Sequence, residues 1–423
     1  MNRFIFERYE FETTTNTAHF YYAFEDGRAF HESVSFDAEA EYNLELLERA
    51  LFLAFILVGV SYYKLFPSAE VVLPCDLDHW QVRFFNHVYQ EGLSQFAYEN
   101  ELTRHDLAHF VFSLDAPAPS PVPYAGSGRL VLQSGGKDSL LVASILHEKD
   151  TPYIAWYLGS TPKYPALLEQ LGVSLKSSVR SIDIAGLKAG IHDGGKDGHV
   201  PITYIVQSFA LIQAILLGKN EVIVSIAHEG EEPHHHIDDL AVTHQWSKTW
   251  SAEQDFSHYV STYISPDLRV GSPLRSLSEM RVAELFVEHA WEAFGHSFSS
   301  CNVANYQQGN DNTTLKWCGN CPKCANSYLL FAPFLPASEL QSIFGGQDLF
   351  SKSTLSRTFM GLLDINNVPK PFECIGEIDE LRLAYDKSQQ RGGYDALPFD
   401  VPASHFDSAR TYDAQAWATE MLQ

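Results

Sequence analysis

The sequence has no hydrophobic run long enough to cross a membrane. Its most apolar stretch, ALFLAFILVGV at residues 50–60, has eleven residues and follows Glu48 and Arg49, whereas a membrane-spanning helix needs about 20 apolar residues. We expect this stretch to form a buried core helix and the protein to have no membrane partner. The first residues mix charged and apolar side chains, which predicts no secretory signal, so the expected location is the cytoplasm.

Positive charge is scarce. The 423 residues include 29 Lys and Arg against 53 Asp and Glu, a formal net charge of −24. Proteins that bind nucleic acid through many phosphates usually carry the opposite sign, so we expect no nucleic-acid partner. An anionic small molecule would need a local basic patch on this background. The length predicts two or three domains.

Cysteine is rare outside one short segment. Of six cysteines, four lie between residues 301 and 324, in the pattern C-x16-C-x2-C-x2-C. This clustering is not that of a disulfide framework and favours a metal site in a reducing compartment. Four thiolates suit a closed tetrahedral Zn²⁺ site, although iron–sulfur ligation and free thiols remain alternatives. The predicted ligands of a structural Zn²⁺ are Cys301, Cys318, Cys321 and Cys324.

The first part of the chain reads as an α+β domain. Residues 3–36 alternate apolar and polar side chains, as short antiparallel strands do, and helices are expected over 40–60 and 78–98. Four prolines with glycine and serine then follow in DAPAPSPVPYAGSGR, which is typical of a linker. We therefore expect an N-terminal domain over residues 1–114 and a Pro-rich linker over 115–128.

After the linker the pattern changes to alternating strands and helices, which is typical of a mostly parallel sheet with helices on both faces. The predicted fold class is therefore α/β, and ligands of such sheets bind at the carboxyl ends of the strands. A nucleotide-binding domain is expected over 129–300, a zinc-knuckle and helical region over 301–385, and a polar tail over 386–423. The predicted strands are 129–133, 153–158, 179–184 and 221–227, and the predicted helices are 139–149, 164–172 and 203–218.

One strand runs directly into a glycine loop and then a helix, in RLVLQSGGKDSLLVASIL. Glycines let the backbone approach a ligand closely, and a helix N-terminus attracts anions. Lys137 adds a cation, Asp138 could hold Mg²⁺, and Ser139 could cap the helix or donate to phosphate. The loop matches neither GxxxxGK[ST] nor GxGxxG, so it predicts a phosphate site of another type.

The hexapeptide SGGKDS at 134–139 resembles the SGGxDS motif of the PP-loop ATP pyrophosphatases. Those enzymes cleave ATP to AMP and pyrophosphate, usually by adenylating a carboxylate or a carbonyl oxygen. The letters GGKD recur at 194–197, where Asp193 and Gly198 replace the flanking serines, and we expect that copy to be a mobile loop near the nucleotide. The resemblance implies a PP-loop (HUP-like) nucleotide-binding domain in which ATP is bound by Ser134, Gly135, Gly136, Lys137, Asp138 and Ser139.

Substrate-binding residues are expected beyond the strand at 221–227. The segment that follows it begins at the carboxyl end of the strand, where α/β sheets bind their substrates. Arginines further along could fork onto a carboxylate or a phosphate, and a surface ion pair is the alternative for each. The candidates are His244, Gln245, Trp246 and Lys248 in that segment and Arg275 and Arg281 beyond it.

Seven segments, taken by their order and spacing, resemble the MurL-type epimerases of peptidoglycan precursor synthesis, over about residues 40–380. The resemblance implies inversion of the terminal L-Glu of UDP-MurNAc-L-Ala-L-Glu to D-Glu through an acyl-adenylate, with ATP and Mg²⁺ used and AMP and pyrophosphate released. It also implies functional pairing with the Mur ligase that adds L-Glu. The segments are SYYK (61–64), GLSQFAYEN (92–100), SGGKDS (134–139), HQWSK (244–248), SPLRSLSEMRVAELF (272–286), WCGNCPKC (317–324) and KPFECIG (370–376).

Such an epimerisation needs groups that remove and return the α-proton of glutamate. Adenylation removes the charge of the neighbouring carboxylate, so an enolate-like state becomes accessible, and each acid–base group then adds about 10²- to 10⁴-fold. Lys137, next to Asp138, is expected to stabilise charge on the leaving group. The candidates for acid and base are Tyr62, Tyr63, Lys64, His244 and Cys374.

Two other functions stay open on the sequence. One is another PP-loop adenylating enzyme, of the 7-deazaguanine nitrile-forming or tRNA-thiolating type. The other is a non-catalytic nucleotide-binding regulator. The acidic net charge and the aromatic-rich N-terminal part favour the epimerase over the first of these.

Overall fold

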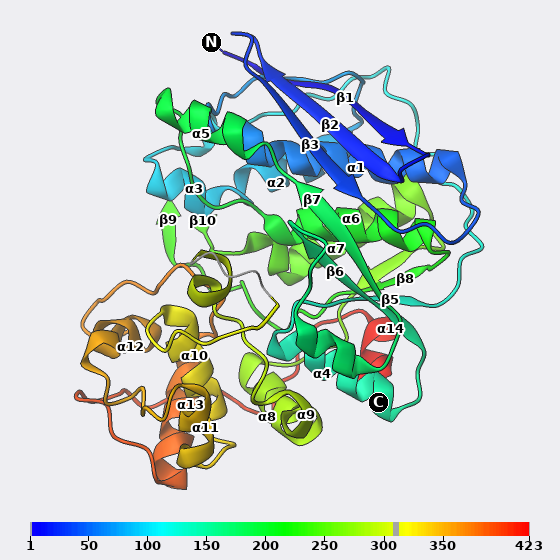
Figure 1. Ribbon diagram of the computed structural model, residues 1–423. Helices are drawn as coiled ribbons and strands as arrows, with labels where there is room; N and C mark the ends of the chain where they lie inside the picture. The colour runs from blue at the N-terminus through cyan, green and yellow to red at the C-terminus, as the bar shows by residue number, and fades with distance from the viewer. Residues whose placement is uncertain (1, 308–312, 423) are drawn as a thin grey trace.

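The computed structural model describes residues 2–307 and 313–422. Within these residues nine strands form one mixed sheet, and helices cover both of its faces (Figure 1). The large, mostly parallel α/β sheet predicted from the sequence is confirmed. Across the sheet the strands are, in order, β11 Arg269–Gly271, β8 Glu221–Ile223, β5 Arg129–Leu132, β6 Tyr153–Gly159, β7 Leu175–Ser181, β3 Ala29–Ser35, β2 Thr17–Phe24, β1 Phe4–Glu12 and β4 Val71–Val72.

The strands β11, β8, β5, β6 and β7 run parallel to one another. The chain passes from β5 to β6 and β7 on one side, and then crosses to β8 and β11 on the other side of β5. A reversal of this kind makes a switch point, and ligands of open α/β sheets bind outside the carboxyl ends of the strands there. The switch point lies between β5 and β8, and the loop that leaves β5 is SGGKDS.

The N-terminal strands extend this sheet and do not form a separate layer. β3 pairs antiparallel with β7, with Val34 opposite Arg180, and β2 and β1 continue the sheet outward. Next to this pairing, Arg180 Nε donates to Glu32 Oε1 at 2.6 Å, and the Tyr62 hydroxyl donates to Glu32 Oε2 at 2.9 Å. The sheet is therefore continuous across the segment 115–128 that we expect to be a linker, and the domain boundaries stay a prediction.

Two hydrophobic cores lie on the two faces of the sheet, because alternate strand residues point to opposite faces. Leu130 and Trp156 belong to one core, and Val131 and Ala155 belong to the other. The helices that pack in the first core include α1 Leu44–Tyr63 and α6 Ile202–Leu216, and those in the second include α4 Lys137–Glu148 and α8 Glu279–His289.

Helix α1 contains the apolar stretch at 50–60 and confirms that it forms a buried core helix. All side chains from Leu53 to Tyr63 are buried. The helix begins at Asn43, whose side chain accepts hydrogen bonds from the backbone N–H groups of Glu45 and Leu46, as N-cap asparagines do. None of the helices in residues 2–307 and 313–422 is long and apolar enough to cross a membrane.

The helix expected over 78–98 is divided into α2 His79–Gln90 and α3 Ser94–Glu99. The break contains Gly92, where a Cβ would lie 3.1 Å from the Pro201 side chain. Glycine at this position lets the segment before α6 approach the chain, and the helix is interrupted there because glycine is a poor helix former.

Three other segments differ from the sequence-based expectation. Residues 164–172 contain a 3-10 helix, Ala166–Leu171, which ends at the left-handed Gly172, and short helical pieces commonly take this form. β7 begins before the expected 179–184, and α5 Ile184–His192 follows it. β8 ends at Ile223, before the expected end at 227. The Val224 N–H still donates to the Gly271 carbonyl, whereas the N–H of Ile226 bonds to the Ser272 hydroxyl.

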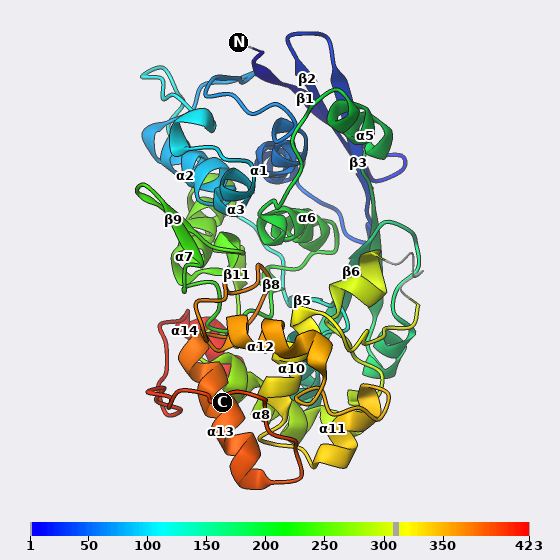
Figure 2. The same ribbon diagram turned by 90° about the vertical axis from the view of Figure 1, so that its left-hand side faces the viewer.

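The C-terminal helices share the second core with α4 and α8, in the lower half of Figures 1 and 2. The polar tail then returns to the sheet, since Gln415 Nε2 donates to Glu253 Oε1 and to the Val270 carbonyl, both at 2.9 Å. The remaining elements are α7 Trp250–Tyr259, α9 Trp291–Phe294, α10 Pro322–Phe331, α11 Ala337–Ile343, α12 Ser356–Leu362, α13 Ile378–Arg391, α14 Ala416–Thr419 and the hairpin of β9 His235–Ile237 and β10 Leu240–Val242.

Candidate active site

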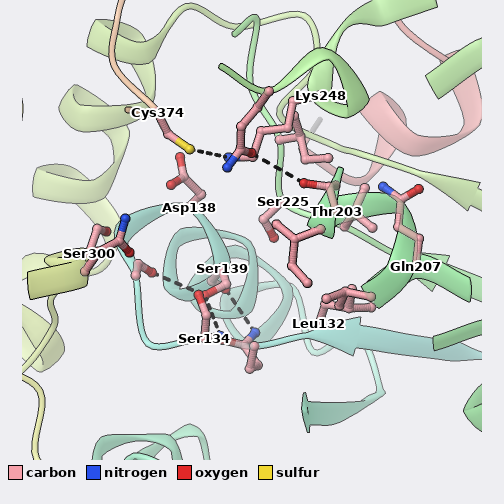
Figure 3. A pocket seen from close by; sticks show the side chains of 18 of the residues that line it. Leu132, Ser134, Asp138, Ser139, Thr203, Gln207, Ser225, Lys248, Ser300 and Cys374 are labelled. Carbon is pink, nitrogen blue, oxygen red and sulfur yellow. Dashed lines mark hydrogen bonds between the residues drawn. The ribbon is translucent and has the colours of Figure 1, made fainter. Parts of the chain in front are cut away.

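A cavity opens beyond the carboxyl ends of β5 and β8 (Figure 3). Its volume is about 1140 Å³, including the open mouth. The lining comes from the SGGKDS loop, the first turns of α6, the chain after β8 and the segment 299–306, together with Lys248, Lys323 and Cys374. The cavity therefore lies at the switch point, where an α/β sheet binds its ligand.

The SGGKDS loop is closed by its two serines. Ser139 Oγ accepts a hydrogen bond from the Ser134 N–H at 3.4 Å and donates to the Gly136 carbonyl at 3.3 Å. Helix α4 begins at Lys137, two residues earlier than expected, with Gly136 at its N-cap, so Ser139 does not cap the helix. Gly135 has φ +79°, and a Cβ there would lie 2.4 Å from Leu315 Cδ1, so this position requires glycine.

Lys137 is buried in an ion pair with two carboxylates. Its Nζ lies 2.6 Å from Asp138 Oδ1 and 2.6 Å from Glu279 Oε2. Burial lowers the pKa of Lys137, but the two carboxylates outweigh burial and raise the pKa overall. Burial raises the pKa of Asp138, but the Lys137 charge lowers it overall, whereas burial holds the pKa of Glu279 above its usual range. Asp138 therefore faces the cavity as a carboxylate, with the ammonium beside it.

Polar atoms without partners line the same cavity. Gln133 Oε1 and Ser225 Oγ are buried and have no hydrogen-bond partner among the described residues. Buried polar atoms are normally paired, so these two suit a polar ligand. The N-terminus of α4 adds unpaired backbone N–H groups that favour phosphate. The unpaired polar side chains and the helix N–H groups thus fit ATP. The Asp138 carboxylate is a suitable ligand for Mg²⁺.

Lys248 brings a second ammonium group to the cavity. Its Nζ donates to Glu229 Oε2 at 3.1 Å and lies 3.6 Å from Cys374 Sγ. Burial lowers the pKa of Lys248, but Cys374, Glu229 and Asp138 raise it overall, so Lys248 stays charged. Figure 3 shows Lys248 and Cys374 on the side of the cavity opposite Ser134.

The four cysteines predicted to bind zinc come together at one point. Their Sγ atoms all lie within 4.8 Å of one another, and the shorter pairs are Cys321 with Cys324 at 3.5 Å and Cys301 with Cys321 at 3.6 Å. Tetrahedral Zn–S bonds of about 2.3 Å place neighbouring sulfurs about 3.8 Å apart. The cluster could hold one zinc ion, and the closeness of the sulfurs favours a single ion over the larger iron–sulfur core.

Comparison with known proteins shows the family. Residues 1–272 match the MurL N-terminal domain, and residues 297–399 match the MurL C-terminal domain. The chain belongs to the MurL family. The first match runs across the Pro-rich segment 115–128, in keeping with the continuous sheet.

Three relatives, each named UDP-N-acetyl-alpha-D-muramoyl-L-alanyl-L-glutamate epimerase, resemble this MurL-family chain over most of their length. The Xanthomonas oryzae pv. oryzae protein is 31% identical over 91% of this chain and 85% of the relative. The Salinispora tropica protein is 30% identical over 94% of this chain and 87% of the relative. The Micromonospora sp. protein is 30% identical over 98% of this chain and 94% of the relative.

The two arginines predicted to hold substrate lie outside the lining of the cavity. Arg275 is fully buried, with its Nε 2.7 Å from Glu253 Oε2 and its Nη1 2.8 Å from the carbonyl oxygen of Lys248. Arg281 is half-exposed on α8 and pairs with Glu284. In this MurL-family chain Arg275 positions the segment that carries Lys248. Arg281 forms the surface ion pair considered as the alternative from the sequence, whereas the ion pair of Arg275 with Glu253 is buried.

Lys323 is a cavity residue that the sequence did not single out. It lines the cavity from α10, inside the cysteine knuckle, and its Nζ donates to the Cys374 carbonyl at 2.5 Å. Its position within CGNCPKC was the available signal, because a knuckle folded against the sheet brings its intervening side chains to the same edge. Lys248 and Lys323 together form the local basic patch required on an acidic background.

The candidates for acid and base differ in whether they line the cavity. The Tyr62 hydroxyl donates to Glu32, the Tyr63 hydroxyl donates to the Ser68 carbonyl, and Lys64 Nζ donates to Asp197. None of these three side chains lines the cavity. His244 lines a small adjoining pocket, and Trp246 packs its ring against Tyr204. Gln245 and Cys374 line both the cavity and this pocket.

The second GGKD stretch does not reach the cavity. Residues 194–197 follow α5, and Lys64 Nζ lies 2.5 Å from Asp197 Oδ1. The described lining of the cavity includes none of these four residues. The stretch leads instead to His199, whose ring lies 4.7 Å from that of His244. Contacts with Lys64 and Asn100, at the ends of α1 and α3, hold this loop outside the lining of the cavity, and its location near the nucleotide stays a prediction.

Proposed function

We propose that the protein is an ATP-dependent epimerase that inverts the terminal L-Glu of UDP-MurNAc-L-Ala-L-Glu to D-Glu in peptidoglycan precursor synthesis. The carboxylate of that glutamate is first joined to AMP, with release of pyrophosphate, and water then releases AMP. The observation that carries the proposal is that the SGGKDS loop, Lys248 and Cys374 line one cavity in a chain whose relatives are named epimerases of this substrate.

The side chains of the cavity suit activation of a carboxylate. The closed SGGKDS loop and the N-terminus of α4 present N–H and hydroxyl donors to phosphate. Mg²⁺ bound at Asp138 would neutralise phosphate charge. Lys248 remains an ammonium group and would attract the substrate carboxylate into the cavity. Lys137, held between Asp138 and Glu279, keeps Asp138 ionised and oriented.

The same residues suit the loss of the α-proton. A free carboxylate repels the carbanion that forms beside it, and the acyl-adenylate removes that charge. Preorganised charges in a water-poor site stabilise the developing enolate oxygen without rearrangement. Lys248 provides such a charge at the wall of the cavity.

The alternatives have less support. Other PP-loop adenylating enzymes would share the SGGKDS loop and the cysteine cluster, but the two MurL domain matches cover most of the chain. A non-catalytic nucleotide-binding regulator would need neither a second ammonium group nor a thiol in the cavity, and this cavity has both.

The test combines product analysis with stereochemistry. Purified protein is incubated with ATP, Mg²⁺ and UDP-MurNAc-L-Ala-L-Glu, and AMP, pyrophosphate and the chirality of the recovered glutamate are measured. We expect all three changes, and no AMP with UDP-MurNAc-L-Ala, which lacks the glutamate. AMP formation with unchanged L-Glu would indicate a different adenylating enzyme. ATP binding without AMP formation would indicate the regulator.

A further inference from the structure

We propose that Cys374 is the catalytic base that removes the α-proton of L-Glu, with Lys248 as its charged partner. The inference rests on the proposed function and names the residue that performs its central step. The acid–base candidates are the side chains of Tyr62, Tyr63, Lys64, His244 and Cys374. Of these five, all within the described part of the chain, Cys374 alone lines the cavity of the SGGKDS loop.

The first supporting observation is the position of the thiol relative to the phosphate site. Figure 3 shows Asp138, Lys248 and Cys374 gathered at one end of the cavity. The acyl carbon of an acyl-adenylate is joined to the α-phosphate, so the α-carbon lies one bond beyond it. A base for the α-proton must therefore lie close to the groups that hold phosphate. Cys374, 3.6 Å from Lys248 Nζ, meets that requirement.

The second observation is that a ligand is expected in this cavity independently of the cysteine. Gln133 is 5% exposed, and its Oε1 has no hydrogen-bond partner among the described residues. Its Nε2 donates to the Ser139 carbonyl at 3.0 Å, which holds the amide against the SGGKDS loop. A buried amide oxygen of this kind suits a ligand that brings a donor.

The third observation is that the backbone of Cys374 is held in place. Lys323 Nζ binds the Cys374 carbonyl at 2.5 Å, and the N–H of Gly376 donates to Asn326 Oδ1 at 3.1 Å. Both partners belong to α10, the helix that begins within the cysteine knuckle. Catalytic groups act best when neighbouring contacts fix their position, and here the zinc-binding region provides those contacts.

Electrostatics then determines how the thiol works. Burial raises the pKa of Cys374, and the charges of Lys248 and Lys323 lower it. The carboxylates of Glu229 and Glu373 raise it as well, so the pKa stays above its usual range. The thiolate is thus a minor but strongly basic form at neutral pH, and Lys248 is placed to stabilise it. The rate of proton removal should rise as the pH is raised toward the pKa of the thiol.

Proton removal and release of AMP are linked through one water molecule. The Cys374 thiolate takes the α-proton, and the electron pair of the C–H bond moves into the enolate of the acyl-adenylate. A water molecule in the cavity donates a proton to the opposite face of the α-carbon. The resulting hydroxide attacks the acyl carbon, breaks its bond to the phosphate oxygen and releases AMP. The Cys374 thiol returns its proton to solvent.

The experiment compares Cys374→Ala and Cys374→Ser with Cys75→Ala, a change at an exposed cysteine away from the cavity. Two reactions are followed in each full-length protein with UDP-MurNAc-L-Ala-L-Glu. Substrate-dependent exchange of pyrophosphate into ATP reports adenylation, and deuterium incorporation at the α-carbon in D₂O reports proton removal. Thermal melting checks that each variant is folded.

We expect Cys374→Ala to lose deuterium incorporation by about 10²- to 10⁴-fold while pyrophosphate exchange stays within about threefold of the unchanged protein. Cys374→Ser should also be slow, and Cys75→Ala should behave as the unchanged protein does. Normal deuterium incorporation in folded Cys374→Ala would overturn the inference. So would loss of both reactions in folded Cys374→Ser, which would assign the residue to adenylation. Failure of the unchanged protein to form D-Glu would refute the proposed function itself, a separate outcome.

Discussion

The two GGKD stretches share four residues and differ in everything around them. Residues 135–138 lead from β5 into the first turn of α4, with Lys137 buried between Asp138 and Glu279. Residues 194–197 follow α5, and Lys196 Nζ donates to the Asn100 carbonyl at 3.3 Å. A glycine-rich tetrapeptide becomes a candidate phosphate loop through the strand before it, the helix after it and the charges packed against its lysine.

The largest expected contrast is between Lys137→Ala and Lys196→Ala. Lys137→Ala removes the counter-charge of the buried Glu279 and of the partly exposed Asp138. Breaking a buried ion pair typically costs about 3–5 kcal/mol, and AMP formation should fall by about 10²- to 10³-fold. Lys196→Ala should change the free energy of unfolding by no more than about 1 kcal/mol and leave AMP formation unchanged. Urea denaturation and AMP release measure both effects.

A second variant separates folding from chemistry at Lys137. In Lys137→Ala/Glu279→Gln one of the two uncompensated charges is removed, so part of the stability should return while AMP formation stays low. Recovery of AMP formation in this double variant would show that Lys137 acts only through stability. Equal effects of the two lysine variants would remove the distinction between the two stretches.

Loss of the metal site should disturb the first stretch and spare the second. Cys321→Ser removes one of four ligands, and the purified protein should contain well below one zinc per chain by elemental analysis. Ser299 lies two residues before Cys301 and connects the cysteine cluster to the first stretch. Its N–H donates to the Gly135 carbonyl at 3.2 Å. Amide hydrogen exchange should therefore accelerate around Gly135 and stay unchanged at 194–197. Cys75→Ser is the matched control, and equal acceleration in both stretches would contradict the coupling.

The glycines offer a smaller contrast. Gly135 and Gly194 both have positive φ, +79° and +90°, so alanine at either costs about 1 kcal/mol or more of backbone strain. Only at Gly135 does the new Cβ meet a side chain, 2.4 Å from Leu315 Cδ1, whereas nothing lies within 4 Å at Gly194. We expect Gly135→Ala to raise the KM for ATP and Gly194→Ala to leave it unchanged.

Leu315→Ala provides the check on this explanation. In Gly135→Ala/Leu315→Ala the clash is gone and only the backbone strain remains, so part of the ATP affinity should return. If the double variant binds ATP as weakly as Gly135→Ala does, the close approach of Leu315 is not the cause.

The smallest expected effect is the loss of stability in acid that is caused by two histidines. His199 follows the second stretch, and the ring of His244 lies beside that of His199. Burial lowers the pKa of His199 to about 4 and that of His244 to about 2. Because the unfolded chain takes up these protons near pH 6.5 and the folded chain does not, stability is full above pH 6.5 and falls below it. Each histidine should cost about 1.4 kcal/mol per pH unit below that point.

Urea midpoints at pH 7.5 and pH 5.5 measure this loss. The difference should shrink in His199→Asn/His244→Asn and persist in His105→Asn, a change at an exposed histidine. An unchanged difference in the double variant would show that acid destabilises the protein through other groups.

Local patterns predicted the local features of this protein. The strand, loop and helix around SGGKDS and the buried helix at 50–60 depend on neighbours a few residues apart, and the four cysteines lie in one segment, 301–324. The structure contains all of these features. The roles of the lysines and arginines were harder to predict. Lys137 meets Glu279, 142 residues further along the chain, and no local pattern contains such a partner.

The sequence by itself therefore determined the mostly parallel sheet, the glycine loop that leaves β5 and the grouping of four cysteines, because hydrophobic periodicity, glycine and grouped thiols are properties of single segments. Only the tertiary structure decided which charged groups face the cavity. Arg275 is held by Glu253 in the interior, Lys248 and Lys323 reach the cavity, and the second GGKD stretch does not. The reason is physical: Coulomb attraction and desolvation depend on distance and burial in space, which the order of residues along the chain does not specify.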